Sequence, residues 1–476
     1  MKSMQNKNVN SLLAFLKLVP GERPFLVNNS INLTYADIVD FSEKKLIEYG
    51  FCAGKNIAVS FESRALACQI LPSLSELAKN LLIIPSGLND EVVNSFFDKA
   101  NIEYIFRCMD DGIEINKLTE FAETDSDNTT RNGNWILATS GTTGKPKLVS
   151  YGLQQLTNST KTDLSKGSLY NWALIYDVNR FAGLQVYFQA LMSGSKLTVL
   201  EQADSLESVI DVLVQTNVNC ISATPSFFRK LLMNPRCDSI DLKRITLGGE
   251  IADQTILNSL SRLYPLSKIS HIYASTEAGV GFVVKDAKEG FPLNYIDNKT
   301  LLSTSTSTST STSTSTSTST STSTSLKIKN ETLWIKSAST AESIVSGTFE
   351  FDEFGYINTG DLVCIKGDRV LFLGRESGTI NVGGNKVIPE EIENVLLTHP
   401  LISECRVFGK ASSMMGMLVA CDVVIIDPRL ASSDLKKSIQ EYTKKYLDSF
   451  KVPVLIKFVN EIEKNSVGKI KRNLAS

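Results

Sequence analysis

The stretch "WILATSGTTGKPKLVS" runs from Trp135 to Ser150. It begins with an apolar run and then sets two glycines among four hydroxyl-bearing residues, before two lysines. Glycines let backbone N–H groups turn toward an anion, while hydroxyls and lysines add donors and positive charge. The pattern therefore predicts a strand followed by a phosphate-binding loop.

This loop differs from the one in Walker-type nucleotide hydrolases, which requires Gly, four residues and then Gly-Lys-Ser/Thr. Lys145 does follow Gly144, but Thr139 stands where the first glycine is needed. Pro146 follows the lysine and has no hydroxyl to place on magnesium. A Walker-type hydrolase is therefore not indicated, and from this stretch alone an ordinary polar turn stays open.

The bulk composition is that of a globular protein. The chain has 476 residues, 42% of them hydrophobic and 21% charged, with a formal net charge of −2. This length suggests two or more domains, and the charge gives no general attraction to nucleic acid or anionic membrane. No apolar run reaches membrane-spanning length, and no export signal is recognised at the start. We therefore expect a cytoplasmic protein with no nucleic-acid or membrane partner.

Cysteine and histidine chemistry is not favoured. The eight cysteines are scattered without a CxxC pair, so neither a zinc cage nor a disulfide scaffold is indicated, and buried reduced thiols are expected. The only histidines are His271 and His399, both expected to be packing or turn residues. This scarcity directs attention to lysine, carboxylates and magnesium.

The order of apolar runs predicts an α/β fold. Strand-like runs at 56–61, 81–87, 103–107, 172–177, 196–201, 219–225 and 244–250 alternate with helical spacing at 73–80, 90–101, 205–217 and 225–234. This alternation favours a large domain of layered parallel sheets with helices. Short runs at 326–337, 348–358, 362–368 and 369–375 predict a small antiparallel β subdomain. After Arg375, strands and helices predict a small α+β domain.

Residues 303–325 alternate strictly between Ser and Thr. Such a segment buries no apolar surface, so a disordered loop is favoured over an ordered strand, although Thr suits strands. Loop closure costs little more as a loop lengthens, so the segment fits within one domain. The expected domains are 1–374, with this loop, and 375–476.

Five motifs occur in a fixed order along the chain: "TSGTTGKPK" from Thr139, "YASTEAG" from Tyr273, "GYINTGDLV" from Gly355, "GRESGTINVGGNKVIPEEIE" from Gly374 and "NSVGKIKR" from Asn465. Together they resemble the adenylate-forming superfamily, which comprises acyl-CoA synthetases, adenylation domains of peptide synthetases and luciferases. The resemblance spans nearly the whole chain. It implies that a carboxylate attacks the α-phosphate of ATP and that a thiol then takes the acyl group from the acyl-adenylate.

The resemblance also implies roles in ATP binding. Thr276 is expected to donate to the α-phosphate and Glu277 to hold Mg²⁺. Asp361 is expected to accept both ribose hydroxyls, with Arg375 near the ribose or phosphate. The β- and γ-phosphates are expected at Thr139, Ser140, Gly141, Thr142, Thr143, Gly144 and Lys145. The adenine slot is expected at Gly248, Gly249, Glu250, Tyr273, Ala274 and Ser275, with Tyr273 as a plain core aromatic left open.

A catalytic lysine and a mobile C-terminal domain are also implied. Lys469 matches the family's C-terminal lysine, which reaches both the acyl carboxylate and the α-phosphate. Family members then rotate this domain so that the stretch at Gly383 and Gly384 meets the thiol, and the pivot is expected around Ser377. Such closure keeps water from the mixed anhydride.

The acid itself is not identified by the sequence. Arg180 stands where many acyl and aryl ligases have a gating His or aromatic, and Phe181 stands where amino-acid-activating domains have Asp. An α-amino acid is therefore disfavoured, while Arg180 either forms a structural ion pair or holds a second anionic group. The pocket is expected within 180–185 and 222–228, including Gly183 and Thr224, and fits a small or medium acyl group.

These inferences give an ATP-, Mg²⁺- and coenzyme A-dependent ligase of a small carboxylic acid. One alternative is an adenylating enzyme that loads the phosphopantetheine of a separate acyl carrier protein. A second is a non-catalytic descendant that binds nucleotide or a partner, which the retained Lys469, Glu277 and Asp361 disfavour. A luciferase-type oxygenase has no supporting feature.

Overall fold

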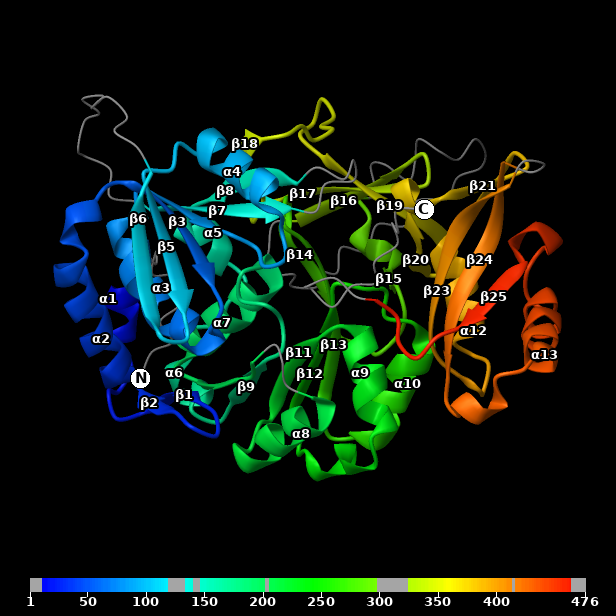
Figure 1. The fold of residues 1–476 in the computed structure, drawn as a ribbon, viewed down its shortest axis with the longest axis horizontal. Helices are drawn as coiled ribbons and strands as arrows, with labels where there is room; N and C mark the ends of the chain where they lie inside the picture. The colour runs from blue at the N-terminus through cyan, green and yellow to red at the C-terminus, as the bar shows by residue number, and fades with distance from the viewer. Residues whose placement is uncertain are drawn as a thin grey trace, which may run out of the picture.

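The computed structural model describes residues 11–118, 133–139, 146–201, 205–297, 324–412 and 416–463. Within these ranges the strands form four sheets, A to D, and the helices pack on their faces (Figure 1). Sheets A and B form the layered α/β part, sheet C is antiparallel, and sheet D belongs to a C-terminal α+β unit. The expected fold class is therefore confirmed.

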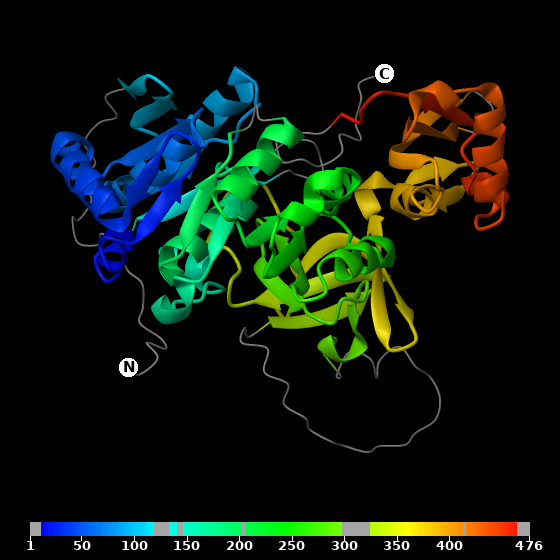
Figure 2. The same ribbon diagram turned by 90° about the horizontal axis from the view of Figure 1, so that it is seen from below.

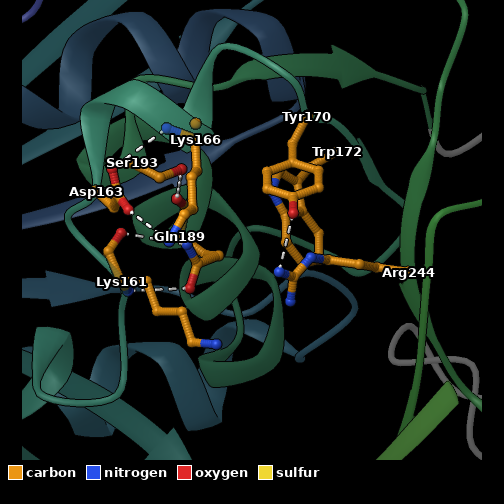
Figure 3. A pocket seen from close by; sticks show the side chains of 9 residues that line it. Lys161, Asp163, Lys166, Tyr170, Trp172, Gln189, Ser193 and Arg244 are labelled. Carbon is orange, nitrogen blue, oxygen red and sulfur yellow. Dashed lines mark hydrogen bonds and ion pairs between the residues drawn. The ribbon is translucent and has the colours of Figure 1, made fainter. Parts of the chain in front are cut away.

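Sheet A carries most of the expected site. Its strands are β1 (Pro24–Val27), β2 (Asn32–Thr34), β9 (Asn171–Leu174), β10 (Lys196–Val199), β11 (Cys220–Ala223), β12 (Arg244–Gly248), β13 (Lys268–Ser275) and β14 (Gly279–Val284). Their order is β14-β13-β12-β11-β9-β10-β1-β2. All neighbours are parallel except the two end pairs, β13 with β14 and β1 with β2. A cavity lies beside the amino ends of β9 and β12 (Figure 3).

Sheet B is a second, mixed sheet. It contains β3 (Asn56–Phe61), β4 (Asn80–Ile83), β5 (Tyr104–Met109), β6 (Gly112–Lys117), β7 (Asn134–Thr139), β8 (Lys147–Tyr151) and β18 (Ser343–Ser346). The order is β18-β8-β7-β4-β3-β5-β6. The strands β7, β4, β3 and β5 are parallel, and antiparallel strands close both edges. The expected strand at 56–61 is confirmed over its full length.

Helices fill the space between the two sheets and cover their outer faces. Between sheets A and B lie α1 (Leu12–Leu16), α2 (Tyr35–Glu48), α3 (Arg64–Leu77) and α7 (Phe181–Ser193), which share one core with both sheets. The other face of sheet A is covered by α8 (Leu206–Gln215), α9 (Pro225–Met233) and α10 (Gln254–Leu263). The other face of sheet B is covered by α4 (Asp90–Lys99). Short α5 (Leu153–Thr157) and α6 (Leu164–Gly167) precede β9.

Sheet C is the expected antiparallel subdomain. It contains β15 (Phe291–Pro292), β16 (Thr324–Lys329), β17 (Thr332–Ser337), β19 (Ile357–Lys366) and β20 (Arg369–Arg375), in the order β15-β20-β19-β17-β16. The strand expected across 348–358 is wrong as far as Tyr356. There the Asp352 carboxylate accepts hydrogen bonds from the N–H groups of Phe354 and Tyr356, at 3.0 and 2.8 Å, and holds a turn.

The C-terminal unit has a separate sheet and core. Sheet D contains β21 (Ile380–Val382), β22 (Asn385–Val387), β23 (Ile402–Ser412), β24 (Gly416–Ile425) and β25 (Leu455–Phe458). The helices α12 (Pro389–Leu396) and α13 (Ser433–Lys444) pack on it around one apolar cluster. Figure 2 shows this unit, in orange and red, beside the rest of the molecule. The boundary at residue 375 stays a prediction.

Three further expectations concern composition. The Ser-Thr segment 303–325 lies outside the described residues except for Thr324 and Ser325, which begin β16. All eight cysteines are free thiols; seven are buried and Cys364 is half-buried, and burial raises the pKa of Cys52 to about 11. No helix in the described part of the chain is long and apolar enough to cross a membrane.

Candidate active site

Most of the expected site residues that the structure describes lie at one edge of sheet A. The strands β11, β12 and β13 run parallel, so the residues that follow them gather at their carboxyl ends, where open α/β sheets bind ligands. Thr224 follows β11, Gly249 follows β12, and Thr276 follows β13. Arg180 lies beyond the carboxyl end of β9. The fold thus brings together segments that are far apart in the sequence.

Asp361 is the centre of a polar cluster at the junction of sheets A and C. It lies on β19 directly opposite Arg375 on β20, and the Nε of Arg375 is 2.8 Å from its Oδ1. The hydroxyl of Tyr273, from β13, donates a hydrogen bond to Oδ2 at 2.5 Å. Asp361 is buried, so the cation and the hydroxyl stabilise a carboxylate that would otherwise be costly to bury.

The charge around Arg375 is mainly negative. Burial alone would lower the pKa of its guanidinium, but the charges of Asp361, Glu277 and Glu390 raise that pKa above its ordinary value. Glu277 and Glu390 therefore lie close enough to Arg375 to interact electrostatically. Glu390 lies in the first turn of α12, so Arg375 interacts electrostatically with residues of both the large part of the chain and the C-terminal unit.

Tyr273 does not offer a ring face to a nucleobase in this structure. Its ring is stacked between Phe282 and Phe372, with centroids 5.2 Å away on each side and interplanar angles of 13° and 9°. An adenine could meet only the edge of the ring. This packing favours the alternative that Tyr273 is a core aromatic, with its hydroxyl on Asp361, while its expected place in the adenine slot stays a prediction.

The turn at Thr276 and Glu277 is held from two sides. The hydroxyl of Tyr151, from β8 of sheet B, donates to the carbonyl of Thr276. The N–H of Ala341 donates to the carbonyl of Glu277 at 3.1 Å. Burial, followed by the charge of Glu277, raises the pKa of Tyr151, so this carboxylate lies near the phenol. Both carbonyls are thus engaged by neighbouring elements, which fixes the turn while the Glu277 side chain stays partly exposed.

The segment Gly248–Glu250 forms another wall of the edge. The hydroxyl of Tyr176 donates to the carbonyl of Gly248 at 2.9 Å, and Gly249 has φ +80°, a conformation that favours glycine. Oε2 of Glu250 accepts from the N–H of Ser226 at 3.0 Å. Its Oε1 is buried and has no hydrogen-bond partner among the described residues. A buried acceptor without a donor is the kind of group that a ligand amine satisfies.

The expected substrate-pocket residues have structural contacts of their own. Thr224 caps α9, since its hydroxyl accepts from the N–H of Phe227 at 3.1 Å, and Phe181 packs against Tyr151 at 5.9 Å. A Cβ on Gly183 would lie 2.1 Å from the carbonyl oxygen of Asp177. Packing against that turn is a sufficient reason for a glycine at 183, and its expected place in the substrate pocket stays a prediction.

Arg180 is the positively charged residue among those expected to line the substrate pocket. It is the N-cap residue of α7, without a side-chain capping hydrogen bond, and burial lowers the pKa of its guanidinium while the charge of Asp177 raises it. The Asp177 carboxylate accepts from the Ser86 hydroxyl at 2.7 Å and from the N–H of Asn179 at 2.9 Å. Both earlier readings of Arg180, as a structural cation and as a substrate contact, stay open.

The phosphate loop and the catalytic lysine fall largely outside the described residues. Thr139 ends β7 and is buried, whereas 140–145 and Lys469 are not described. Lys147 is engaged elsewhere: its Nζ donates to the carbonyl of Thr348 at 2.5 Å and lies 4.3 Å from the ring centroid of Phe349. The roles expected for Ser140 to Lys145 stay predictions.

Gly383 and Gly384 form the two-residue turn between β21 and β22. Their φ angles are +56° and +91°, which the tight hairpin requires and which favour glycine. The Asn381 side chain accepts from the N–H of Gly384 at 3.0 Å. The hairpin turn is therefore a local structural reason for the two glycines. Their expected contact with the thiol after rotation of the C-terminal domain stays a prediction.

Four residues of this site were missed by sequence reasoning: Tyr151, Tyr176, Phe282 and Phe372. Tyr151 and Tyr176 both use a phenol hydroxyl to fix a backbone carbonyl in the candidate site. Each follows an apolar run, so the available signal was an aromatic with a polar end next to an expected loop. Aromatic residues after apolar runs are common, so this signal could not have distinguished Tyr151 and Tyr176 from the others.

A magnesium ion was expected at Glu277. No cluster of three or more His, Cys, Asp or Glu side chains able to hold a metal occurs among the residues with described positions. Mg²⁺ bound to nucleotides takes most ligands from phosphates and water and only one or two from carboxylates. A single partly exposed glutamate at the edge of the site therefore fits a nucleotide-borne ion and does not fit a resident structural metal.

Comparisons with known proteins agree with this architecture. A family model described as AMP-binding enzyme matches residues 97–313, and one described as AMP-binding enzyme C-terminal domain matches 391–469. The chain is 24% identical to 2-succinylbenzoate–CoA ligase of Bacillus subtilis (strain 168), over 99% of this chain and 98% of the relative. It is 24% identical to 4-chlorobenzoate–CoA ligase of Arthrobacter sp., over 92% of this chain and 89% of the relative.

Solved structures agree on the fold. ATP-bound MatB from Rhodopseudomonas palustris superposes with a TM-score of 0.73 at 16% identity, covering 98% of this chain and 97% of that one. The o-succinylbenzoate CoA synthetase of Bacillus subtilis with its acyl-adenylate intermediate gives a TM-score of 0.69 at 18% identity, covering 97% and 96%. On this evidence the chain belongs to the adenylate-forming superfamily of AMP-binding enzymes, and its enzyme class is that of the AMP-forming acid–thiol ligases.

Proposed function

We propose that the protein is an ATP-dependent acid–CoA ligase. A carboxylate oxygen of the acid bonds to the α-phosphorus of ATP, the bond to the bridging oxygen breaks, and pyrophosphate leaves. The sulfur of coenzyme A then attacks the acyl carbon, the bond to AMP breaks, and the thiol proton is released. The observation that carries this proposal is the cluster of Asp361, Arg375 and Tyr273 beside the Thr276–Glu277 turn, at the carboxyl edge of sheet A.

Each residue of this cluster suits one part of a nucleotide. An ionised carboxylate offers about four lone-pair directions. Tyr273 and Arg375 occupy one on each oxygen of Asp361, which leaves acceptors for the two ribose hydroxyls. Oε1 of Glu250 is a buried acceptor suited to an amino group such as that of adenine. Thr276 adds a hydroxyl donor for the α-phosphate, where negative charge grows during attack.

Glu277 would hold Mg²⁺, which neutralises phosphate charge when bound. Lys469 would bring an ammonium between the acyl carboxylate and the α-phosphate, two anions that otherwise repel each other. Removing one preorganised donor of this kind lowers rates by about 10²–10³. The protein's contribution to the first step is therefore positioning and charge stabilisation.

Coenzyme A is the proposed acceptor because the relatives matched over most of their length are named CoA ligases. An enzyme that loads a separate acyl carrier protein would use the same first step. Supplying the purified protein with ATP, an active acid and either coenzyme A or a phosphopantetheinylated carrier separates the two. Thioester formed only on the carrier would reject coenzyme A as the acceptor.

The acid is proposed to carry a second anionic group, held by Arg180. The half-buried Arg180 guanidinium at the carboxyl edge carries a positive charge that a substrate anion can approach, and Phe181 adds an apolar wall beside it. Relatives include ligases named for 2-succinylbenzoate and for oxalate, acids with two carboxylates. The latter is 36% identical over 26% of this chain and comes from Arabidopsis thaliana.

Acid-dependent pyrophosphate release tests both parts of the proposal. A panel pairs each dicarboxylic acid with its monoacid or monoester, so that size is matched and charge differs. We expect the diacid of the correct pair to react at least about tenfold faster, and Arg180→Gln to remove that preference. Arg262→Gln, on the exposed surface of α10, is the matched control. An equal preference in wild type and Arg180→Gln would reject the second anionic group but not the ligase reaction.

A further inference from the structure

A cavity of about 220 Å³ lies at the amino edge of sheet A. It is bordered by the start of β9, the start of β12, α6 and the end of α7. Its lining residues are Lys161, Asp163, Lys166, Gly167, Tyr170, Trp172, Gln189, Ser193 and Arg244. Figure 3 shows Tyr170, Trp172 and Arg244 gathered on one side and the other labelled residues on the opposite side. None of these residues has a role in the proposed ligase reaction.

The charge of this cavity is positive. Asp163 and Lys166 cancel each other, since the Lys166 Nζ lies 3.3 Å from Asp163 Oδ2. Hydrogen bonds from Ser165 and Lys166 lower the pKa of Asp163 to about 2, so it stays ionised. Lys161 and Arg244 remain as the cations without an acidic partner among the lining residues.

Lys161 experiences this excess of charge directly. Lys161 is an exposed residue, and the pKa of its ammonium is lowered first by partial desolvation and then by the positive charges of Arg244, Lys285 and Lys268. Cations that repel one another across a partly buried space are stabilised by a bound anion. The surroundings of the cavity thus add positive charge beyond its own walls.

Two buried donors in the walls lack acceptors. Trp172 is nine-tenths buried, and its indole Nε1 has no hydrogen-bond partner among the described residues. The Nε of Arg244 is likewise buried without a partner there. The same guanidinium is fixed by its Nη2, which donates to the Tyr170 hydroxyl at 3.1 Å, and it lies 4.6 Å from the Tyr170 ring centroid. Tyr170 therefore holds the Arg244 guanidinium in place in the cavity wall, while the two buried nitrogens lie behind the cavity surface.

We propose that this cavity binds a small organic oxyanion, a carboxylate or a phosphate ester, between Lys161 and Arg244 and against the Tyr170 and Trp172 rings. Water could fill the space, but it could not balance the two cations. A cavity of about 220 Å³ has room for an organic group as well as an oxyanion. The Tyr170 and Trp172 rings offer that organic group an apolar wall.

The cavity is separate from the candidate active site. Arg244 begins β12 and Gly248 ends it, so the strand spans about 13 Å between the two, at roughly 3.3 Å per residue. The cavity faces the amino ends of the strands, while Gly249 and Thr276 follow the carboxyl ends. A ligand in the cavity would therefore bind together with ATP.

The test uses the full-length protein without ATP and follows tryptophan emission during titration with benzoate or with glycerol phosphate. Trp172 is one of three tryptophans, so binding should change part of the signal in a saturable way. The two probes distinguish a carboxylate ligand from a phosphate ester. In Trp172→Phe the change should disappear, and in Arg244→Gln and Lys161→Gln the dissociation constant should rise at least about tenfold.

Two matched variants should bind the probes as wild type does. Arg262→Gln removes a surface arginine from α10, and Lys145→Gln changes the expected phosphate loop. Lys161 is exposed, so Lys161→Gln decides the matter even if Arg244→Gln fails to fold. No saturable change with either probe would overturn the proposal, as would a response lost in Lys145→Gln but kept in Lys161→Gln.

Discussion

Replacing Asp361 with asparagine tests the proposed nucleotide site most directly. In the structure, Oδ1 pairs with the Nε of Arg375 at 2.8 Å and Oδ2 accepts from Tyr273 at 2.5 Å. An amide has one acceptor oxygen. If that oxygen faces Arg375, the NH₂ group faces the Tyr273 hydroxyl, which must then accept a hydrogen bond instead of donating one. In either orientation Arg375 loses its counter-charge, and the NH₂ group offers no acceptor to a ribose hydroxyl.

The expected effect on ATP follows from these contacts. A hydrogen bond to a charged acceptor contributes about 1.5–3 kcal/mol, so losing one to the ribose raises the KM for ATP about 10- to 140-fold. The assay is pyrophosphate release by Asp361→Asn at saturating acid and varied ATP. The KM for the acid should change little, because Asp361 is assigned to the ribose.

Asp352→Asn is the matched control. Asp352 is also an ion-paired carboxylate next to sheet C, with Lys327 as its partner and side chains that are 8% and 12% exposed. Both variants lose a partly desolvated ion pair and should lose comparable stability in chemical denaturation. Only Asp361→Asn should raise the KM for ATP, and a KM within twofold of wild type in that variant would refute the ribose assignment.

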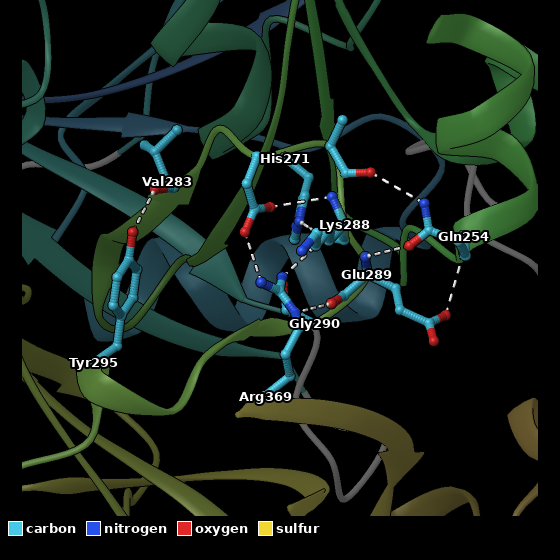
Figure 4. A network of polar contacts seen from close by, with 10 residues as sticks. Gln254, His271, Val283, Lys288, Glu289, Gly290, Tyr295 and Arg369 are labelled. Carbon is cyan, nitrogen blue, oxygen red and sulfur yellow. Dashed lines mark hydrogen bonds and ion pairs between the residues drawn. The ribbon is translucent and has the colours of Figure 1, made fainter. Parts of the chain in front are cut away.

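Three other variants have defined outcomes. Lys469→Ala should abolish acyl-adenylate formation but spare conversion of a supplied acyl-adenylate to thioester, measured by pyrophosphate release and by thioester yield; equal loss in both would contradict the two-arrangement mechanism. Gly183→Ala should cost about 1–3 kcal/mol of stability, because its Cβ would lie 2.1 Å from the Asp177 carbonyl oxygen, whereas Gly50→Ala, with open space, should be neutral in the same thermal melts. Burial lowers the pKa of His271, whose Nε2 lies 2.9 Å from the Lys288 carbonyl (Figure 4), so the unfolded chain binds this proton first and native stability falls as pH drops below about 6.5. His271→Gln should reduce that slope in denaturant titrations between pH 5 and 7.5, and an unchanged slope would contradict the burial argument.

The parts of the fold that follow local rules were predictable from the sequence. The helices expected at 90–101, 205–217 and 225–234 all form, because each begins at a polar N-cap residue and carries an apolar face. The caps are Asn89, Ser205 and Thr224. Helix α7 was not predicted, because it lies between sheets A and B and is buried along nearly its whole length. A helix that is apolar on all sides has no amphipathic period to detect.

Long-range pairing limits what the sequence reveals about the site. The ordered motifs identified Asp361, Arg375 and Tyr273 one by one, but their contact depends on the register of β19 with β20 and on the position of β13. Tyr273 was expected to line the adenine slot, with a core aromatic left open, and the residues that cover its ring, Phe282 and Phe372, lie on two other strands. Nothing local to Tyr273 encodes those neighbours.

The pivot expected near Ser377 stays a prediction, and two observations bear on it. Lys230 on α9 lies 3.3 Å from Glu404 on β23, with 43% of the lysine side chain and 13% of the glutamate side chain exposed. Solvent around the lysine screens this pair, so we expect it to contribute little more than the roughly 0.2–1 kcal/mol of exposed pairs, and breaking it is a small obstacle to rotation. Around Gly378 nothing would meet an added Cβ, whereas at Gly374 a Cβ would lie 2.3 Å from the Glu390 carboxylate. The chain is thus tightly packed just before the expected hinge and open within it, which is where rotation of the domain would have to begin.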